Sequence, residues 1–283
     1  MFGTLLGGII HFLQNLRTLR RPQRSAKLKS SLQSFQISSQ VLKSLGALLI
    51  FSFAFFSCEN DQRDIRDYYF PLKDLKDGLV YEYRELEMDS LSPDFWYYRT
   101  LPTDSAFYFT KAYYQNDFVP RQLYRELMVD NGIVIKDLYL FEADSSGQQV
   151  QTKAEVISSN VFPFEVSGTD ELYIYQVRFQ LPSQPHGNTT VLINRRFIGD
   201  TTYVFQDKTY DAVQFEVLGS VDQRDSILGD IEPHFSGKEI YAENLGLVYY
   251  ERAYGKDAPA FRHKLVNRYP MSDLEEQARE EWE

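Results

Sequence analysis

Alternation of apolar and polar residues with a period of two is the feature that most constrains the fold of this chain. It runs from Leu79 to Tyr269 in successive short segments rich in Tyr, Phe, Val and Ile. Successive side chains of a strand point to opposite faces, so each segment can bury one face and expose the other. Turn residues separate the segments, and we expect tight turns at Asn131-Gly132 and Gly199-Asp200. The pattern predicts an antiparallel, all-β domain.

The expected strands share this alternation or a run of aromatic and β-branched residues. We place them at 79–87, 94–101, 105–113, 121–129, 132–142, 149–157, 171–180, 189–198, 201–206, 209–221, 239–254 (a pair) and 261–269. Such strands bury one face only if neighbours curl over a common core, so we expect a half-barrel or barrel in preference to a sandwich. One short helix is expected at Asp273–Glu283, because Ser272 and Glu275 have capping-box spacing just after Pro270.

The phase of the alternation indicates which side chains face the core. In the segment 171–180, Tyr175 is expected inside and Arg178 outside. In the first long strand, Leu86 joins the inner face of Tyr81 and Tyr83 if a bulge precedes it. These positions make the expected architecture testable one side chain at a time.

The segment before the strands has a different composition. Lys43 is followed by an apolar run of about 12 residues, Leu45–Phe56, within the ~7–15 of a signal h-region and short of the ~20 that span a bilayer. Ser57 and Cys58 follow, and this cysteine is the only one in the chain. The segment resembles a bacterial lipoprotein signal peptide with the lipobox Phe55-Phe56-Ser57-Cys58, although Phe56 is bulkier than usual. The resemblance implies cleavage before Cys58 and its acylation; a core helix with a buried cysteine and an uncleaved inner-membrane anchor are the alternatives.

This reading divides the chain into three parts. Residues 1–57 form a basic N-terminal extension with a cleaved signal peptide, 58–67 a lipidated tether, and 68–283 a single β-rich domain. The first 42 residues carry six basic side chains and no acidic one. We expect translation to begin near Val41 or Leu42, the alternative being a long basic n-region.

The charge of the mature part excludes one class of partner. Seven of the 30 Lys and Arg residues precede Cys58 and all 40 Asp and Glu residues follow it, so the formal charge of Cys58–Glu283 is −17. Such a chain repels nucleic acid, and we expect no nucleic-acid partner. The charge is spread along the chain, as solubility requires.

Three segments of the mature chain carry a family resemblance. They are YYFPLKDLKDGLVYEY (68–83), TYDAVQFEV (209–217) and IYAENLGLVYYER (240–252). They resemble uncharacterised Bacteroidetes lipoproteins, which are similar to the half-barrel family that includes periplasmic lipoprotein carriers. Acidic residues after Cys58 also resemble the export signal of surface lipoproteins of that phylum. The resemblance implies a lipid-anchored protein of the outer membrane; it leaves 85–208 unmatched and transfers no catalytic residue.

The sequence contains no recognisable catalytic or metal-binding motif. The histidines of the mature part, His186, His234 and His263, lie far apart, so we expect no metal and no cofactor. The acidic segment 222–232 has Arg224 between its acids, which favours a solvated hairpin end over a calcium loop.

Aromatic side chains in adjacent expected strands are the remaining candidate site. We assign ligand binding to Trp96, Tyr98, Tyr108 and Tyr114 on the concave face of a curved sheet. The alternative is that these rings form the sheet core and cross-strand pairs.

These observations favour a non-enzymatic envelope lipoprotein that binds a hydrophobic or carbohydrate ligand or serves envelope assembly. Its partners would be the membrane, through the lipid anchor, and an envelope protein or an apolar ligand. The alternative is a hydrolase that acts on envelope polymers through a pair of carboxylates.

The basic first 42 residues are predicted to be dispensable for export. Expression from a start codon at Val41 should still give membrane-anchored protein, because a complete signal peptide begins beside it. Fractionation and immunoblotting measure this. Export lost in the shortened version alone would show that the long n-region is required.

Overall fold

The computed structural model describes residues 62–87, 91–103, 107–144, 146–227, 229–255 and 259–282. The expected signal peptide, Cys58 and the first residues of the tether lie outside this part. The first elements are β1 (Arg63–Asp64), η1 (Arg66–Tyr68), β2 (Leu79–Glu85), β3 (Asp94–Pro102), β4 (Phe107–Tyr114), β5 (Pro120–Val129), β6 (Gly132–Ala143), β7 (Gln149–Lys153) and β8 (Glu155–Pro163). The later ones are β9 (Glu165–Val166), β10 (Leu172–Phe179), β11 (Gly187–Phe205), β12 (Lys208–Asp225), β13 (His234–Ala242), β14 (Gly246–Ala253), β15 (Ala260–Tyr269) and α2 (Met271–Trp282).

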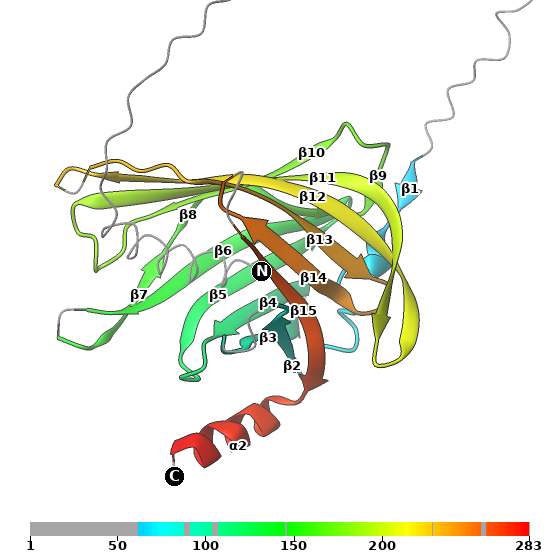
Figure 1. The fold of residues 1–283 in the computed structure, drawn as a ribbon, viewed down its shortest axis with the longest axis horizontal. Helices are drawn as coiled ribbons and strands as arrows, with labels where there is room; N and C mark the ends of the chain where they lie inside the picture. Colours follow the sequence, from blue (N-terminus) through cyan, green and yellow to red (C-terminus); the bar gives the residue numbers. More distant parts are fainter. Residues whose placement is uncertain are drawn as a thin grey trace, which may run out of the picture.

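The main sheet closes on itself. Its strands follow the order β5-β4-β3-β2-β15-β14-β13-β12-β11-β10-β8-β6-β7, and β5 also pairs with β6. Twelve antiparallel strands thus form a ring, and β7 lies against the end of β6 that β8 leaves free. Figure 1 shows these strands curving around a common interior, with α2 outside it. The all-β prediction is confirmed, and of the preferred architectures the sheet adopts the barrel.

Alternation fills the interior with aromatic rings. Tyr175 and Val177 of β10 are fully buried, whereas Ile174 and Arg178 of the same strand are exposed, as predicted. The inward position predicted for Leu86 is wrong, because its side chain is 41% exposed. No bulge turns it inward; Glu85 occupies the inner position and accepts hydrogen bonds from the amides of Glu87 and Arg262.

Residues 63–78 close one end of the barrel, and we call them the N-terminal plug. Ile65 is fully buried, and its N–H donates to the carbonyl of Phe164 at 2.7 Å. The Phe70 ring packs on Tyr98 with 4.3 Å between centroids. Gly246 leaves room for that ring, since a Cβ there would lie 2.5 Å from it. Residues 63–67, expected in the tether, are therefore part of the packed domain.

Two expected turns differ in outcome. The Asn131-Gly132 hairpin exists: Val129 pairs with Gly132, where close approach to the Phe162 carbonyl excludes a side chain. The turn expected at Gly199-Asp200 is wrong, because β11 runs through these residues with only a register shift between Phe197 and Gly199. The chain reverses at Gln206-Asp207 instead. Both have the positive φ that a two-residue hairpin turn requires, 51° and 63°.

The C-terminal helix α2 covers part of the outer wall. It begins two residues earlier than expected, with the amide of Asp273 bonded to the carbonyl of Pro270. Leu274 is buried against Val80 and Phe95, which lie on the outer face of β2 and β3. In the part of the chain that is described, no helix has the length and hydropathy to cross a membrane.

The burial of β10 gives a direct test of the barrel. Tyr175→Ala removes a fully buried ring and should lower the free energy of unfolding by about 3–5 kcal/mol, as Phe→Ala does in other cores. Arg178→Ala on the exposed face of the same strand should change it little. Urea unfolding of both variants measures the difference; similar losses would contradict the assigned faces.

Candidate functional site

The four aromatic residues expected to form a ligand site lie on both faces of the barrel wall. Trp96 and Tyr98 point inward from β3 and are fully buried. Tyr108 and Tyr114 are half-buried on the outer face of β4, because the odd-numbered residues of that strand fill the inward positions. The structure therefore does not bring the four residues together in one cleft.

The contacts of these rings are those of packing. Trp96 and Tyr98 lie nearly parallel, 6.1 Å apart, and Tyr98 also packs on the plug through Phe70. Outside the barrel, the Arg125 guanidinium lies 5.3 Å from the Tyr108 ring centre. Tyr114 lines a shallow hollow next to α2. The inner pair stabilises the core, and the outer pair is divided between two separate surfaces.

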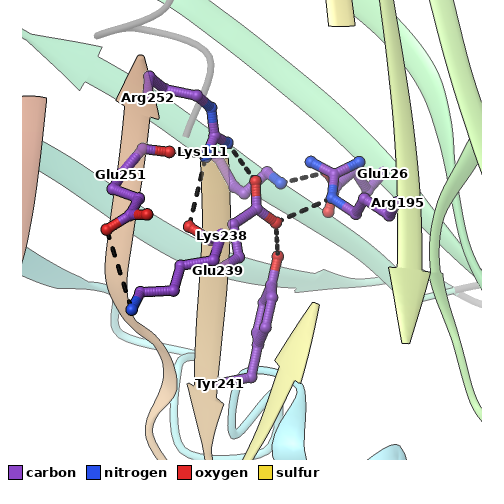
Figure 2. A network of polar contacts seen from close by, with 8 residues as sticks. All are labelled: Lys111, Glu126, Arg195, Lys238, Glu239, Tyr241, Glu251 and Arg252. Carbon is purple, nitrogen blue, oxygen red and sulfur yellow. Dashed lines mark hydrogen bonds and ion pairs between the residues drawn. The ribbon is translucent and has the colours of Figure 1, made fainter. Parts of the chain in front are cut away.

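Charged side chains buried inside the barrel form the most unusual site of the structure. Figure 2 shows its centre, the carboxylate of Glu239 on β13. Its Oε2 accepts a hydrogen bond from Arg195 Nε at 2.9 Å and one from the Tyr241 hydroxyl at 3.2 Å. Its Oε1 accepts one from Arg252 Nη2. Three strands, β11, β13 and β14, are joined by this one carboxylate, and none of its three partners, two charged and one neutral, exceeds 4% exposure.

A second buried ion pair lies on the facing strands β4 and β5. The ammonium of Lys111 contacts Glu126 Oε1, and the hydroxyl of Tyr69 in the plug donates to Glu126 Oε2. Both ionic side chains are buried. This pair therefore fastens the N-terminal plug to the inside of the barrel wall.

The pKa values show how tightly the charges are coupled. Burial alone would raise the pKa of the Glu239 carboxyl, but Arg195 and Arg252 outweigh it and hold the pKa below the ordinary 4.5. Burial also opposes the charge on Arg195, yet the Glu239 carboxylate raises the pKa of that guanidinium above its usual value. For Lys111, burial prevails over Glu126 and lowers the pKa. The Glu239 carboxyl is thus held ionised although it is fully buried.

A third interior cluster surrounds Asp94 at the start of β3. Tyr113 and Tyr250 donate their hydroxyls to its two oxygens at 2.8 and 2.7 Å. The His263 ring stacks on Tyr250 with 4.8 Å between centroids, and its Nε2 lies 3.6 Å from Asp94 Oδ2. Burial lowers the pKa of His263, which favours the neutral ring in spite of Asp94.

Sequence reasoning missed these interior charges, although a signal for them exists. Each charged residue lies in phase with apolar or aromatic neighbours two positions away: Lys111 with Phe109, Glu126 with Tyr124, and Glu239 with Tyr241. A charge at an inward position of an alternating strand must find a buried partner, because an unpaired charge in the interior is very costly. The phase of the alternation therefore marks the residues, but only the fold shows which charge meets which.

Outside the barrel, one groove lies where the chain joins the domain. It has a volume of about 330 Å³ and a mixed lining. Its polar side chains include Gln62, Asn131, Asn160 and Glu171, and its apolar ones are Val129, Ile133, Val134, Phe162 and Pro163. Ser167 and Tyr173 donate their hydroxyls to Glu171, and these bonds lower the pKa of its carboxyl. The groove therefore offers hydroxyl, amide and carboxylate groups beside an apolar wall, a mixture that suits a ligand with both polar and apolar faces.

Among the side chains that the structure describes, no group of three His, Cys, Asp or Glu residues is placed to hold a metal ion. In the acidic segment, Arg224 forms ion pairs with Asp222, Asp230 and Glu232. A guanidinium thus occupies the centre of these acids.

Similarity to known proteins is found among solved structures. No protein-family model and no curated protein matches the chain. The chain is similar to a candidate lipoprotein from Parabacteroides distasonis, at 12% identity and TM-score 0.46, over 70% of this chain and 95% of that one. It is also similar to a candidate exported protein with a YmcC-like fold from Bacteroides fragilis, at 12% identity and TM-score 0.46, over 71% and 98%.

The Glu239 site predicts a large, pH-dependent contribution to stability. Glu239→Gln leaves two buried guanidiniums without their counter-charge and should lower the free energy of unfolding by about 3–5 kcal/mol. Because the folded-state pKa is depressed, the unfolded chain binds the proton more tightly. The contribution is therefore present above the ordinary pKa of 4.5 and is lost as the pH falls below it. Urea unfolding at neutral and acid pH measures both effects.

Glu216→Gln is the matched control. Glu216 pairs with Arg196 across β11 and β12, but on the outer wall where both side chains are exposed. Its loss should cost less than about 1 kcal/mol. Equal losses of unfolding free energy in the two variants would contradict the stabilising role of the interior site. So would a Glu239→Gln variant whose stability falls with acid as steeply as that of the unaltered protein.

Proposed function

We propose that this chain is a lipid-anchored protein of the bacterial cell envelope that acts without catalysis, as a rigid binding or assembly module. The observation that carries the proposal is the spacing between Cys58 and the domain. Cys58 is followed after only three residues by Gln62, which bonds to Glu165, and β1 begins at Arg63. A domain that starts so soon after the acylated residue is held directly against the membrane, at the outer membrane if the family resemblance holds.

The state of the buried carboxylates supports a non-catalytic role. A hydrolase of the expected kind needs a carboxyl group that exchanges a proton with substrate. Both oxygens of Glu239, of Glu126 and of Asp94 accept bonds from side chains of the barrel wall or the N-terminal plug. These groups are engaged in holding strands together, which favours the assembly or binding module over the hydrolase.

The packing of the interior also bears on the ligand. Trp96 and Tyr98 are fully buried among other core rings, which argues against an apolar ligand stacked on them. The groove beside Asn131 and Glu171 offers amide, hydroxyl and carboxylate groups instead. Of the ligands expected from the sequence, a carbohydrate bound in this groove is better supported than a hydrophobic one.

The proposed anchor predicts the mass of the mature protein. Protein extracted from membranes should have the mass of Cys58–Glu283 plus the acyl chains of a lipoprotein, because two or more chains are needed for stable anchoring. Cys58→Ser should abolish acylation and release the protein from the membrane fraction. A Cys58→Ser protein that remains acylated would contradict the proposal.

A further inference from the structure

Large apolar side chains are exposed together where β3 and β5 end and β4 begins. They are Leu101, Phe107, Met128 and Val129, which are 37%, 46%, 40% and 39% exposed. The strands that carry them are neighbours, because Leu101 pairs with Tyr108 and Tyr108 pairs with Leu127. We call the four exposed residues the apolar rim.

The apolar rim is exposed on both faces of the sheet. Phe107 and Met128 are in phase with the buried residues of β4 and β5, so they continue the inner face of these strands at the end of the barrel. Leu101 and Val129 lie on the outer face. None of the four belongs to either apolar core of the residues that the structure describes. Single exposed apolar side chains are common, but a cluster of them marks an interaction surface.

Polar side chains of two kinds stand behind the apolar rim on the outer wall. Arg99 is exposed and precedes Leu101 by two strand residues, about 7 Å. The ring of Tyr108, beside Leu101, has the Arg125 guanidinium 5.3 Å from its centre. Membrane proteins place tyrosines and basic side chains at head-group depth, next to apolar residues that reach further in. The order of side chains along this wall is therefore that of a membrane interface.

The apolar rim lies at the end of the barrel from which the anchor extends. Val129 and Gln62 line the same groove. Cys58 precedes Gln62 by four residues, which span at most about 14 Å. The amide of Thr100 in β3 donates to the carbonyl of Leu75 in the N-terminal plug at 2.8 Å, so the rim is at the plugged end. A bilayer that holds an acylated Cys58 is thus within reach of the rim.

We propose that the apolar rim docks on the surface of the lipid bilayer and fixes the orientation of the barrel on it. The proposal rests on the anchor at Cys58, because the short tether keeps the rim at high effective concentration beside the membrane. A weak interfacial contact is then sufficient for occupancy. Asp130, exposed at the turn after Val129, opposes burial in hydrocarbon and attraction to anionic lipid, so the rim lies among neutral head groups.

The test uses a fluorophore on single engineered cysteines of the full, acylated protein in phosphatidylcholine nanodiscs. The mature chain has no cysteine other than Cys58, which acylation blocks, so Met128→Cys is labelled uniquely. Ile227→Cys is the matched control, since Ile227 is 69% exposed and follows the end of β12 that pairs with Gly187, far from the plug. A nitroxide-bearing head-group lipid then quenches any label that lies at the bilayer surface.

The docking predicts loss of most of the emission at position 128 and little loss at position 227. Phe107→Asp in the chain labelled at 128 should restore most of the emission, because a charge on the rim opposes the contact. Leu218→Asp should leave the quenching unchanged, since Leu218 is 48% exposed but lies in the middle of β12.

Two results would overturn the docking and leave the anchor intact. One is acylated protein in which the label at 128 keeps its emission, as expected if the rim binds a protein instead. The other is equal quenching of the labels at 128 and 227. Mass spectrometry of the same sample separates the two claims. A chain without acyl groups at Cys58 would overturn the anchor, and with it the docking that depends on it.

Discussion

The carboxylate of Glu239, held between Arg195 and Arg252, is the interaction on which the rest of the structure depends. Closing twelve strands into a ring removes the interior from water, so every charged group inside must be paired or hydrogen-bonded. Glu239 joins the three strands β11, β13 and β14, and the pair Lys111–Glu126 joins two more to the N-terminal plug. Breaking one member leaves another charge uncompensated, so the network favours a single register of the strands.

This interior is the basis of the proposed non-catalytic role. Both oxygens of Glu239, of Glu126 and of Asp94 are engaged by side chains on other strands or on the plug. The groove where the chain joins the domain is a surface that remains for the proposed recognition. It is lined in part by Gln62, four residues after Cys58, the residue proposed to be acylated.

Local patterns predicted the strands, the C-terminal helix and the buried face of β10, because alternation and capping depend on residues near in sequence. These patterns gave wrong predictions where the position of a residue depends on segments far away in the sequence. Leu86 is outside because Glu85 meets Arg262, and the chain passes through Gly199 because its partner strand continues to Lys208. For the expected aromatic site, alternation within β4 is enough to place Tyr108 and Tyr114 on the face opposite the buried Phe109 and Tyr113. The partners of the interior charges follow only from the closed sheet.

Closure of the barrel around its plug is the central claim, and native-state hydrogen exchange tests it most directly. The seam is the pairing of β5 with β6, where Tyr124 pairs with Leu138. If the ring is closed, amides of this seam and the Ile65 amide exchange only through global unfolding, as slowly as those in the middle of β11 and β12. Rapid exchange at the seam or at Ile65, with β11 and β12 still protected, would show an open sheet with a loose plug and contradict the account.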